Sequence, residues 1–203
     1  MKREPVFSDS EFAKRYADKH SKMARKFARE YYRKLKGLDF AGGRILDDGC
    51  GSGETLICLL KNFPMAEGIG IDLSEPLLEM AESNAARTGL EKRVIFKKAN
   101  VLEIPFPANY YQVVLNINMA HLVSDPVRMF NEIERVLKAE GHLFIADIRR
   151  SWIGYLEKEF VSAFNTAEVK KLIDSSDIRE GVMTTDFLWW YYETRRRNTN
   201  HGK

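Results

Sequence analysis

Residues 45–55 read Ile45-Leu46-Asp47-Asp48-Gly49-Cys50-Gly51-Ser52-Gly53-Glu54-Thr55. Three glycines stand at alternate positions after two apolar residues and a pair of acids, and a helix-like segment follows. This pattern is typical of a strand that turns sharply into a helix. At such a turn the backbone approaches a ligand closely, and only glycine leaves the room. We therefore predict a turn that binds a nucleotide-like ligand, and we call residues 49–53 the glycine turn.

Strands and helices alternate around the glycine turn. A helix is expected over residues 8–37, capped by Ser8 or Ser10, with one apolar face formed by Phe12, Tyr16, Met23, Phe27, Tyr31 and Leu35. Strands are expected at 44–47, 66–72, 93–98, 111–116 and 142–147. The intervening helices are expected at 54–62, from Ser74 to near Gly89, and from Pro126 to Leu137, with a turn that ends at Gly141. Strands separated by helices of this length indicate an α/β protein with a doubly wound, mostly parallel sheet.

The C-terminal part follows another pattern. Residues 167–173 are expected to form a helix, and residues 183–194 contain the aromatic run Trp189-Trp190-Tyr191-Tyr192. This run suits a strand at or near the edge of the sheet. Because neighbouring residues on a strand point to opposite faces, we expect Trp189 and Trp190 on opposite sides of the sheet.

The chain of 203 residues is expected to form a single domain over residues 1–203. Residues 1–38 are the N-terminal helical part, 39–150 the ligand-binding core, and 151–203 the C-terminal part of the sheet with a basic tail. No apolar run approaches the length of a membrane span, and the first residues contain no apolar core of a signal peptide. Two cysteines, Cys50 and Cys58, make neither a disulfide framework nor a cysteine zinc site. We expect a cytoplasmic protein with no membrane segment and no metal site.

The formal net charge of +3 is unevenly distributed. Residues 1–38 hold 12 Lys and Arg against 5 Asp and Glu, and the tail adds Arg195, Arg196, Arg197 and Lys203. Basic ends suit contact with nucleic acid, an acidic protein or an anionic small molecule. The alternative is a solvated helix face with a basic tail, and the sequence leaves both open.

Four candidate ligand positions stand at the expected carboxyl ends of strands, where open α/β sheets bind their ligands: the glycine turn, Asp72, Asn100-Val101 and Asn116. Asp72 lies 19 residues after Gly53, and a carboxylate there can accept hydrogen bonds from both hydroxyls of a ribose. An acid at a strand end also serves as a helix cap or a solvated loop charge. Together with the glycine turn, however, Asp72 favours a nucleoside ligand.

A dinucleotide is the less favoured nucleoside. In the dinucleotide fingerprint G-x-G-x-x-G, the third glycine would fall where this chain has Glu54. Asp47, Asp48 and Glu54 would also repel a pyrophosphate.

The motifs resemble those of a known family, the class I S-adenosylmethionine-dependent methyltransferases. Asp47-x-Gly49-x-Gly51-x-Gly53 resembles the first motif of the family, and the run from Gly70 to Ser74 resembles the second. The segments from Asn100 to Pro107 and from Glu134 to Lys138 are similar to its later motifs. The resemblance covers about residues 40–150 and is closest to the small-molecule methyltransferases of the ubiquinone and menaquinone type. It implies a Rossmann-like seven-stranded sheet, a helical lid formed by residues 1–38, and S-adenosyl-L-methionine as cofactor.

Carried over to matching positions, the resemblance implies a set of cofactor contacts. Asp47 would help to hold the ammonium group, directly or through water. Gly49 and Gly51 would pack against the methionine part, and Asp72 would take the ribose hydroxyls. The remaining implied residues lie at the adenine or near the sulfonium: Leu73, Asn100 and Val101 at the adenine, and Asn116 near the sulfonium. Cys50 is also expected among the cofactor-binding residues, and we expect it to pack within the turn rather than to act as a nucleophile.

Two residues depart from the family pattern. Asp48 stands where an apolar or small residue is usual, and the sequence offers no explanation for it. Asn100 stands where an aspartate is usual, and its amide oxygen can still accept a hydrogen bond from the adenine amino group.

Methyl transfer is an in-line displacement at an activated carbon, so alignment and the exclusion of water matter most. His121, just beyond the fourth expected strand, is a candidate general base, and a purely structural histidine is the alternative. Tyr16 on the lid and Trp152 after the fifth strand are candidate lining residues, and each is also compatible with a place in the core.

Three functions stay open at this stage. The leading one is a methyltransferase for a small-molecule acceptor. The segment from Asn116 to Met119 lacks the Asn/Asp-Pro-Pro-aromatic motif of many adenine and glutamine methyltransferases, which counts against those substrates. The second is an RNA or protein methyltransferase that uses the basic helix and tail. The third is a cofactor-binding partner subunit without catalytic activity of its own.

Overall fold

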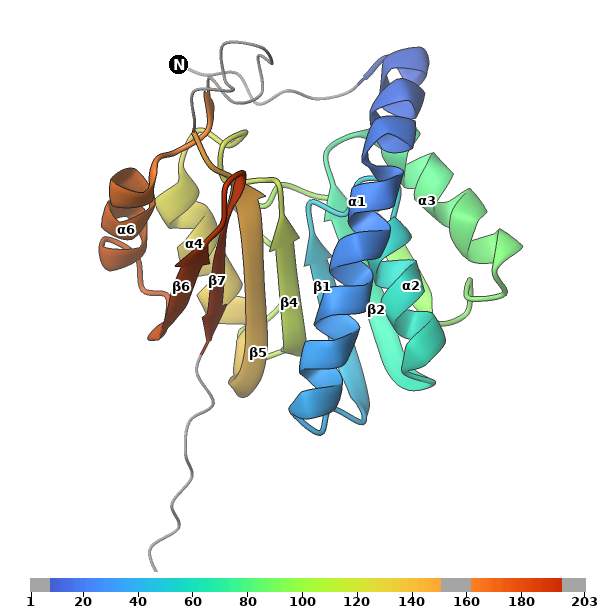
Figure 1. The fold of residues 1–203 in the computed structure, drawn as a ribbon. Coiled ribbons are helices and arrows are strands. Elements are labelled where there is room, and N and C mark those ends of the chain that lie inside the picture. The colour runs from blue at the N-terminus through green and yellow to red at the C-terminus, as the bar shows by residue number, and fades with distance from the viewer. Residues whose placement is uncertain (1–7, 151–161, 195–203) are drawn as a thin grey trace, which may run out of the picture.

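The computed structural model describes residues 8–150 and 162–194. Seven strands form one sheet, and helices lie on both of its faces (Figure 1). The elements in chain order are α1 (Ser10–Gly37), β1 (Gly42–Asp48), α2 (Glu54–Asn62), β2 (Met65–Asp72), α3 (Glu75–Arg87), β3 (Val94–Lys98), β4 (Tyr111–Ile117), α4 (Pro126–Val136), β5 (Leu137–Ile148), α6 (Thr166–Asp174), β6 (Gly181–Thr185) and β7 (Trp189–Thr194).

The strand order is β3-β2-β1-β4-β5-β7-β6. The first five strands of this order are parallel, while β7 pairs antiparallel with both β5 and β6. The predicted α/β fold with a doubly wound, mostly parallel seven-stranded sheet is confirmed. The strand order reverses at β1, so the carboxyl ends of β1 and β4 flank the point where such sheets bind ligands.

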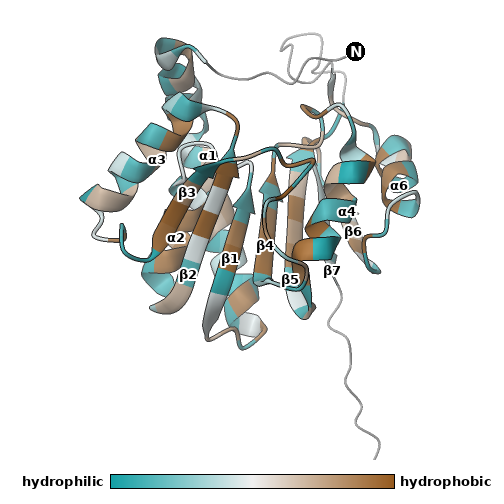
Figure 2. Cartoon of the chain, turned by 180° about the vertical axis from the view of Figure 1, so that it is seen from behind, coloured by the Kyte–Doolittle hydropathy of each residue, from teal (hydrophilic) through white to brown (hydrophobic). Residues whose placement is uncertain are grey.

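Alternate residues of the central strands supply two cores, one on each face of the sheet. Ile45 and Val113 pack under α1 and α2, whereas Leu46 and Val114 pack under α4 and α6. Figure 2 shows the apolar residues concentrated on these strands. Trp189 belongs to the first core and Trp190 to the second, as the sequence predicted.

Helix α1 is anchored through its C-terminal half. Phe27, Tyr31 and Leu35 are buried against α2 and the sheet, whereas Phe12, expected on the apolar face, is 46% exposed. The expected cap was also wrong: Asp9, not Ser8 or Ser10, accepts a hydrogen bond from the Phe12 amide at 2.7 Å. A carboxylate at this position also complements the positive end of the helix.

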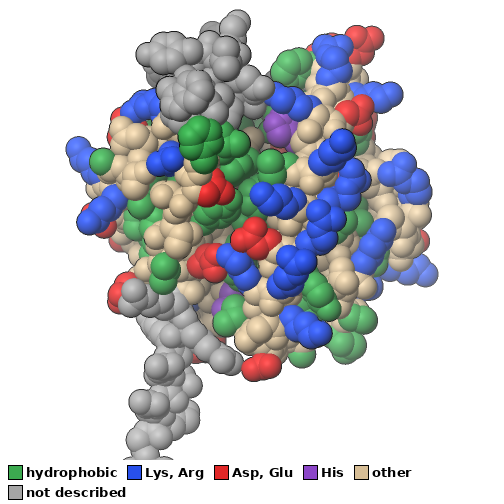
Figure 3. Space-filling model, viewed as in Figure 1, with side chains coloured by type: hydrophobic (Ala, Val, Ile, Leu, Met, Phe, Trp, Pro, Cys, Tyr) green, Lys and Arg blue, Asp and Glu red, His purple; other side chains and the backbone are tan. Residues whose placement is uncertain are grey.

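The exposed side of α1 is strongly basic, as the space-filling view shows (Figure 3). We define the basic face of α1 as its exposed cations, which are Lys14, Arg15, Lys19, Lys22, Arg25, Lys26, Arg29, Arg33 and Lys36. The basic tail, residues 195–203, lies outside the described residues.

Most predicted boundaries lie within two residues of the structure, and two elements differ in a more important way. Strand β5 begins at Leu137 rather than after Gly141, because Leu137 has an extended backbone and pairs with Tyr111 ahead of a β-bulge. The stretch 183–194 contains parts of two strands, β6 and β7, rather than one. Asp186 turns the chain between them by accepting hydrogen bonds from the Leu188 and Trp189 amides at 2.8 Å each. Strand β6 therefore forms the edge, and the aromatic strand β7 lies one place inside it.

Candidate cofactor site

The glycine turn joins the end of β1 to the start of α2. Gly49, Gly51 and Gly53 all have positive φ angles, of 85°, 51° and 72°. The amides of Gly49 and Cys50 both donate to the carbonyl oxygen of Ile71 at 2.9 Å, which fixes the turn against β2. A Cβ on Gly51 would have no heavy atom within 4 Å, so this part of the backbone faces open space.

Asp72 ties the glycine turn to the end of β2. Its Oδ2 accepts a hydrogen bond from the Gly51 amide, and its Oδ1 accepts one from the Ser74 amide, both at 2.9 Å. Burial raises the pKa of this carboxyl group, while the backbone hydrogen bonds act in the opposite direction. Each carboxylate oxygen retains a lone pair, so Asp72 can still accept hydrogen bonds from a ligand.

A cleft with two lobes opens above the turn. The Asp47 lobe has a volume of about 620 Å³ and the Asp72 lobe one of about 590 Å³, including the space open to solvent. The two lobes share five lining residues, which we call the junction: Tyr16, Gly49, Gly51, Ile117 and Asn118.

The Asp47 lobe contains a buried acid. Asp47 is 2% exposed and lines this lobe together with Cys50 and Thr55. Burial, and next the negative charge of Asp72, raises the pKa of Asp47 to about 7. A cationic group in this lobe would therefore be stabilised by Asp47 and would restore its ionised form.

The Asp72 lobe is mostly apolar around its acid. Leu73, Leu77 and Val101 line it together with Asp72. Asn100 is not among the residues that line either lobe, and its Oδ1 accepts a hydrogen bond from the Leu102 amide at 2.8 Å. The structure thus brings Leu73 and Val101 into the cleft, and it places the Asn100 amide in the turn that follows β3.

Asn116 lies beneath the cleft, not in its lining. It is fully buried on the α4 side of the sheet, and its Nδ2 donates to Asp48 Oδ2 at 2.9 Å. The sequence offered no explanation for Asp48. In the structure Asp48 forms a buried polar pair with Asn116. Burial raises the pKa of Asp48 well above its usual value, while the hydrogen bond from Asn116 acts in the opposite direction.

His121 is also buried, with 2% of its surface exposed. Its Nδ1 lies 2.6 Å from Asp147 Oδ1, and its backbone amide donates to Asp147 Oδ2 at 3.1 Å. These bonds attach the loop after β4 to the end of β5. Neither lobe is lined by His121.

Sequence reasoning missed several residues of the cleft. Asn118, two positions after the predicted Asn116, lines both lobes and donates from Nδ2 to the Tyr16 hydroxyl at 3.3 Å. His20 also lines the Asp47 lobe. Strand alternation could not have found Asn118 reliably, because Asn116 and Asn118 would point to the same side of an ideal strand. In the structure Asn116 is buried beneath the cleft, whereas Asn118, which has a left-handed backbone (φ 61°), lines it.

Trp152, a candidate for the acceptor pocket, lies outside the described residues. Within residues 8–150 and 162–194, no group of three or more His, Cys, Asp or Glu side chains is arranged to hold a metal ion. None of the helices in this part of the chain is long and apolar enough to cross a membrane.

Comparison with known proteins identifies the family of the chain. A family model described as a methyltransferase domain matches residues 39–193. The chain is 35% identical over 108 residues to 27-O-demethylrifamycin SV methyltransferase of Amycolatopsis mediterranei. The aligned region covers 53% of the chain and 39% of that protein. The chain is 29% identical over 127 residues to demethylmenaquinone methyltransferase of Symbiobacterium thermophilum, which covers 62% of the chain and 50% of that protein.

A solved structure shows the same fold over nearly the whole length. A Methanococcus maripaludis protein described as an S-adenosyl-L-methionine-dependent methyltransferase superposes with a TM-score of 0.78 and 19% identity, covering 97% of each chain. The chain belongs to the S-adenosylmethionine-dependent methyltransferase family, whose cofactor is S-adenosyl-L-methionine. Its relatives include an enzyme of the menaquinone type, which confirms the resemblance found in the sequence. The chain spans less than two thirds of the length of the two curated relatives named here.

We expect Asp47→Asn to stabilise the folded chain, and we expect the gain to grow with pH. The pKa of Asp47 is about 7 in the folded chain, against about 3.9 for an unfolded aspartate. Between these two pKa values the wild type takes up a proton on folding and the variant does not. The free energy of unfolding of the wild type therefore falls relative to that of the variant from about pH 4 to about pH 7. Above about pH 7 the difference in stability is constant. The full difference is of the order of a few kcal/mol.

Urea unfolding at about pH 4 and about pH 8 measures this effect, with Asp18→Asn, at an exposed position of α1, as the matched control. A gain in stability that is the same at both pH values would contradict the raised pKa of Asp47.

Proposed function

We propose that the chain transfers the methyl group of S-adenosyl-L-methionine to a small-molecule acceptor by direct in-line displacement. One observation carries this proposal: the glycine turn, Asp47 and Asp72 line a single cleft whose two lobes meet at the junction. The cofactor supplies a methyl group on a positively charged sulfur. The small-molecule acceptor is supported by the relatives, one of which is named for a rifamycin and another for demethylmenaquinone.

The residues of the cleft fit this cofactor chemically. Asp47 is a buried acid with a raised pKa, and a cationic amino group is the partner that such an acid lacks. Gly51 leaves open space where any other residue would place a side chain. Asp72 stands beside an apolar lobe, an arrangement that suits a nucleoside with a polar ribose and a flat base.

The proposed contacts follow from these positions. In the Asp72 lobe, Asp72 accepts hydrogen bonds from the ribose hydroxyls while Leu73 and Val101 pack against the adenine. In the Asp47 lobe, Asp47 holds the amino group, and Gly49, Cys50 and Gly51 form the floor. Asn100 contributes through the turn that positions Val101, and its amide contact with the adenine remains a prediction. Asn116 supports the floor from below through Asp48.

The junction is then the place of reaction. A ligand that fills both lobes passes between Tyr16 and the glycine turn, so its centre lies against Ile117 and Asn118. The task of the protein there is to orient the reacting groups and to exclude water, and correct positioning alone contributes several kcal/mol.

Calorimetry with S-adenosylhomocysteine tests the cofactor assignment. Asp72→Ala is expected to weaken binding at least tenfold, because it removes the acceptor for the ribose and frees the Gly51 amide. Glu75→Ala, which removes an exposed acid nearby, is the matched control. Incubation of fractionated extract with methyl-labelled cofactor then identifies the acceptor. Absence of binding by the wild-type chain would refute the proposal.

His121 is expected to support the fold rather than the reaction. His121→Gln leaves the buried Asp147 carboxylate without its imidazole partner, so unfolding free energy should fall by about 1–3 kcal/mol. The pH profile of methyl transfer to the labelled extract fraction should keep its shape. Loss of the rising limb of that profile in the variant would instead identify His121 as the general base.

A second candidate acceptor, RNA, is favoured by the basic face of α1. Nine exposed cations on one helix are enough to bind a phosphate backbone, and such binding weakens steeply with salt. The small-molecule proposal predicts no binding of tRNA or rRNA at low salt. RNA would be supported instead if the wild type bound tRNA or rRNA and the Lys22→Glu and Arg29→Glu variants bound it more weakly. The affinity of these variants should then also depend less steeply on salt.

A further inference from the structure

Asn118 has a backbone conformation that is rare for its residue type. Its φ angle is 61°, in the left-handed region that residues other than glycine adopt at a cost. Its backbone amide donates to the carbonyl oxygen of Ala146 at 2.7 Å, which ties this position to β5. Costly conformations persist where the surrounding structure enforces them, and they concentrate at ligand sites. Asn118 lines both lobes of the cleft in this conformation, whereas Asn116 is buried beneath it.

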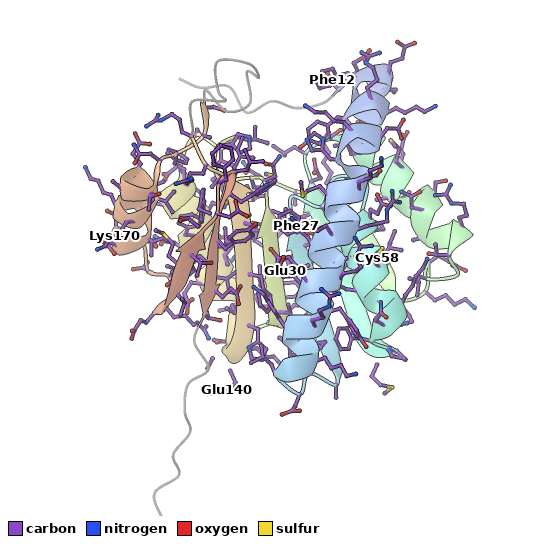
Figure 4. All side chains as sticks on the ribbon, viewed as in Figure 1. Phe12, Phe27, Glu30, Cys58, Glu140 and Lys170 are labelled. Carbon is purple, nitrogen blue, oxygen red and sulfur yellow. The ribbon has the colours of Figure 1, made fainter. Side chains whose placement is uncertain are left out.

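The side-chain amide of Asn118 has a partner at one end only. Its Nδ2 donates to the hydroxyl of Tyr16 on α1 at 3.3 Å. Figure 4 places Phe27, which lines the Asp47 lobe, on the side of α1 that faces β4, so this side of the helix borders the cleft. Asn118 Oδ1 is buried and accepts no hydrogen bond within the described part of the chain. Because most buried polar atoms have a partner, this oxygen points to a ligand.

The other polar groups of the cleft have partners or places of their own. Of the junction residues, Tyr16 and Asn118 have polar side chains, and the Tyr16 hydroxyl receives Asn118 Nδ2. Asp47 and Asp72 line separate lobes, where the proposed function assigns them to the amino group and to the ribose. Asn118 Oδ1 is therefore the side-chain oxygen that remains for the centre of the cofactor.

The centre of the cofactor has a charge of a particular kind. A sulfonium is positive but has no N–H or O–H group, so it cannot donate an ordinary hydrogen bond. An oxygen with a partial negative charge and no bound donor is the partner that suits it. Burial adds to the effect, because an electrostatic attraction is stronger where water does not screen it. Asn118 Oδ1 meets these conditions at the place where the two lobes join.

We propose that Asn118 is a specificity-determining residue whose Oδ1 attracts the positive sulfonium. This attraction raises the affinity of the chain for S-adenosyl-L-methionine relative to its affinity for S-adenosylhomocysteine. Transfer of the methyl group leaves a neutral sulfur, toward which Asn118 exerts no such attraction. The contribution of Asn118 to binding is therefore lost when the product forms, and this loss assists product release.

This inference rests on the proposed function, because it needs the cofactor to span both lobes. It adds a residue that distinguishes the charged cofactor from its neutral product. The resemblance in the sequence implied that Asn116 lies near the sulfonium. Asn116 is instead buried in contact with Asp48, and Asn118 takes that role in this proposal.

Calorimetry of the full chain with S-adenosyl-L-methionine and with S-adenosylhomocysteine tests this role. The quantity to compare is the ratio of the two dissociation constants, because a purely structural residue would change both equally. Asn118→Gly keeps the left-handed backbone without strain and removes the amide. It should weaken the binding of S-adenosyl-L-methionine about fivefold more than that of S-adenosylhomocysteine, which is the effect of one modest polar interaction.

Asn118→Asp provides a change of the opposite sign. Aspartate has nearly the same shape and also tolerates the left-handed region, and its carboxylate attracts a positive charge more strongly than an amide oxygen does. The ratio should therefore move about fivefold toward S-adenosyl-L-methionine when it is measured at about pH 8. Because the two variants shift the ratio in opposite directions, partial loss of folding cannot produce the expected pattern.

Asn109→Gly is the matched control. Asn109 also has a left-handed backbone, with a φ angle of 56°, but it is exposed and lines neither lobe. Its substitution should leave the ratio of the two dissociation constants unchanged.

The outcomes distinguish this inference from the proposed function. An unchanged ratio in Asn118→Gly would overturn the inference and make Asn118 a structural residue. A ratio that moves toward S-adenosyl-L-methionine in this variant would also overturn it, because the amide nitrogen would then face the sulfonium. In both cases the wild type binds the two compounds and the cofactor assignment stands. If neither compound binds to the wild type, the proposed function fails first.

Discussion

The hydrogen bonds of the Asp72 carboxylate hold the site together. One oxygen receives the Gly51 amide and the other receives the Ser74 amide, so a single side chain joins the glycine turn, the end of β2 and the start of α3. The turn has a left-handed backbone at three glycines, and these glycines have no side chains to stabilise it. Its shape therefore depends on Asp72 and on the Ile71 carbonyl oxygen, which receives two further amides. The floor of both lobes follows from this arrangement.

The same region concentrates three acids, of which Asp47 and Asp48 are buried and Asp72 is partly exposed. Asp47 and Asp48 follow each other at the end of β1, and Asp72 stands beside them on β2. Burial raises the pKa of all three carboxyl groups. For Asp47 the pKa rises to about 7, so this acid is partly protonated at neutral pH. Buried acids with raised pKa values are costly for the fold and occur where a binding partner offsets the cost. A ligand with positive charge is the partner that this arrangement favours.

Much of the fold could be predicted from the sequence because its signals are local. The glycine spacing, the alternation of strands and helices, and the opposite faces of Trp189 and Trp190 need only neighbouring residues to be recognised. The contacts that could not be predicted from the sequence are those made across the sheet. Asp48 accepts a hydrogen bond from Asn116, which lies 68 positions later in the sequence. No local sequence pattern indicates that these two side chains meet. The place of His20 in the cleft could not be predicted for a similar reason. A histidine on a basic helix looks like a solvated residue in the sequence, and only the packing of α1 over the strand ends shows that it lines the lobe.

Helix α1 packs against different parts of the chain along its length. Its C-terminal half packs through large buried rings against α2 and the sheet, while Ala13 and Ala17 in the turns above the cleft form a small cluster with Leu77. The hydrogen bond from Asn118 to the Tyr16 hydroxyl joins these turns to the loop after β4. One continuous helix therefore belongs to the apolar core at one end and to the wall of the cleft at the other.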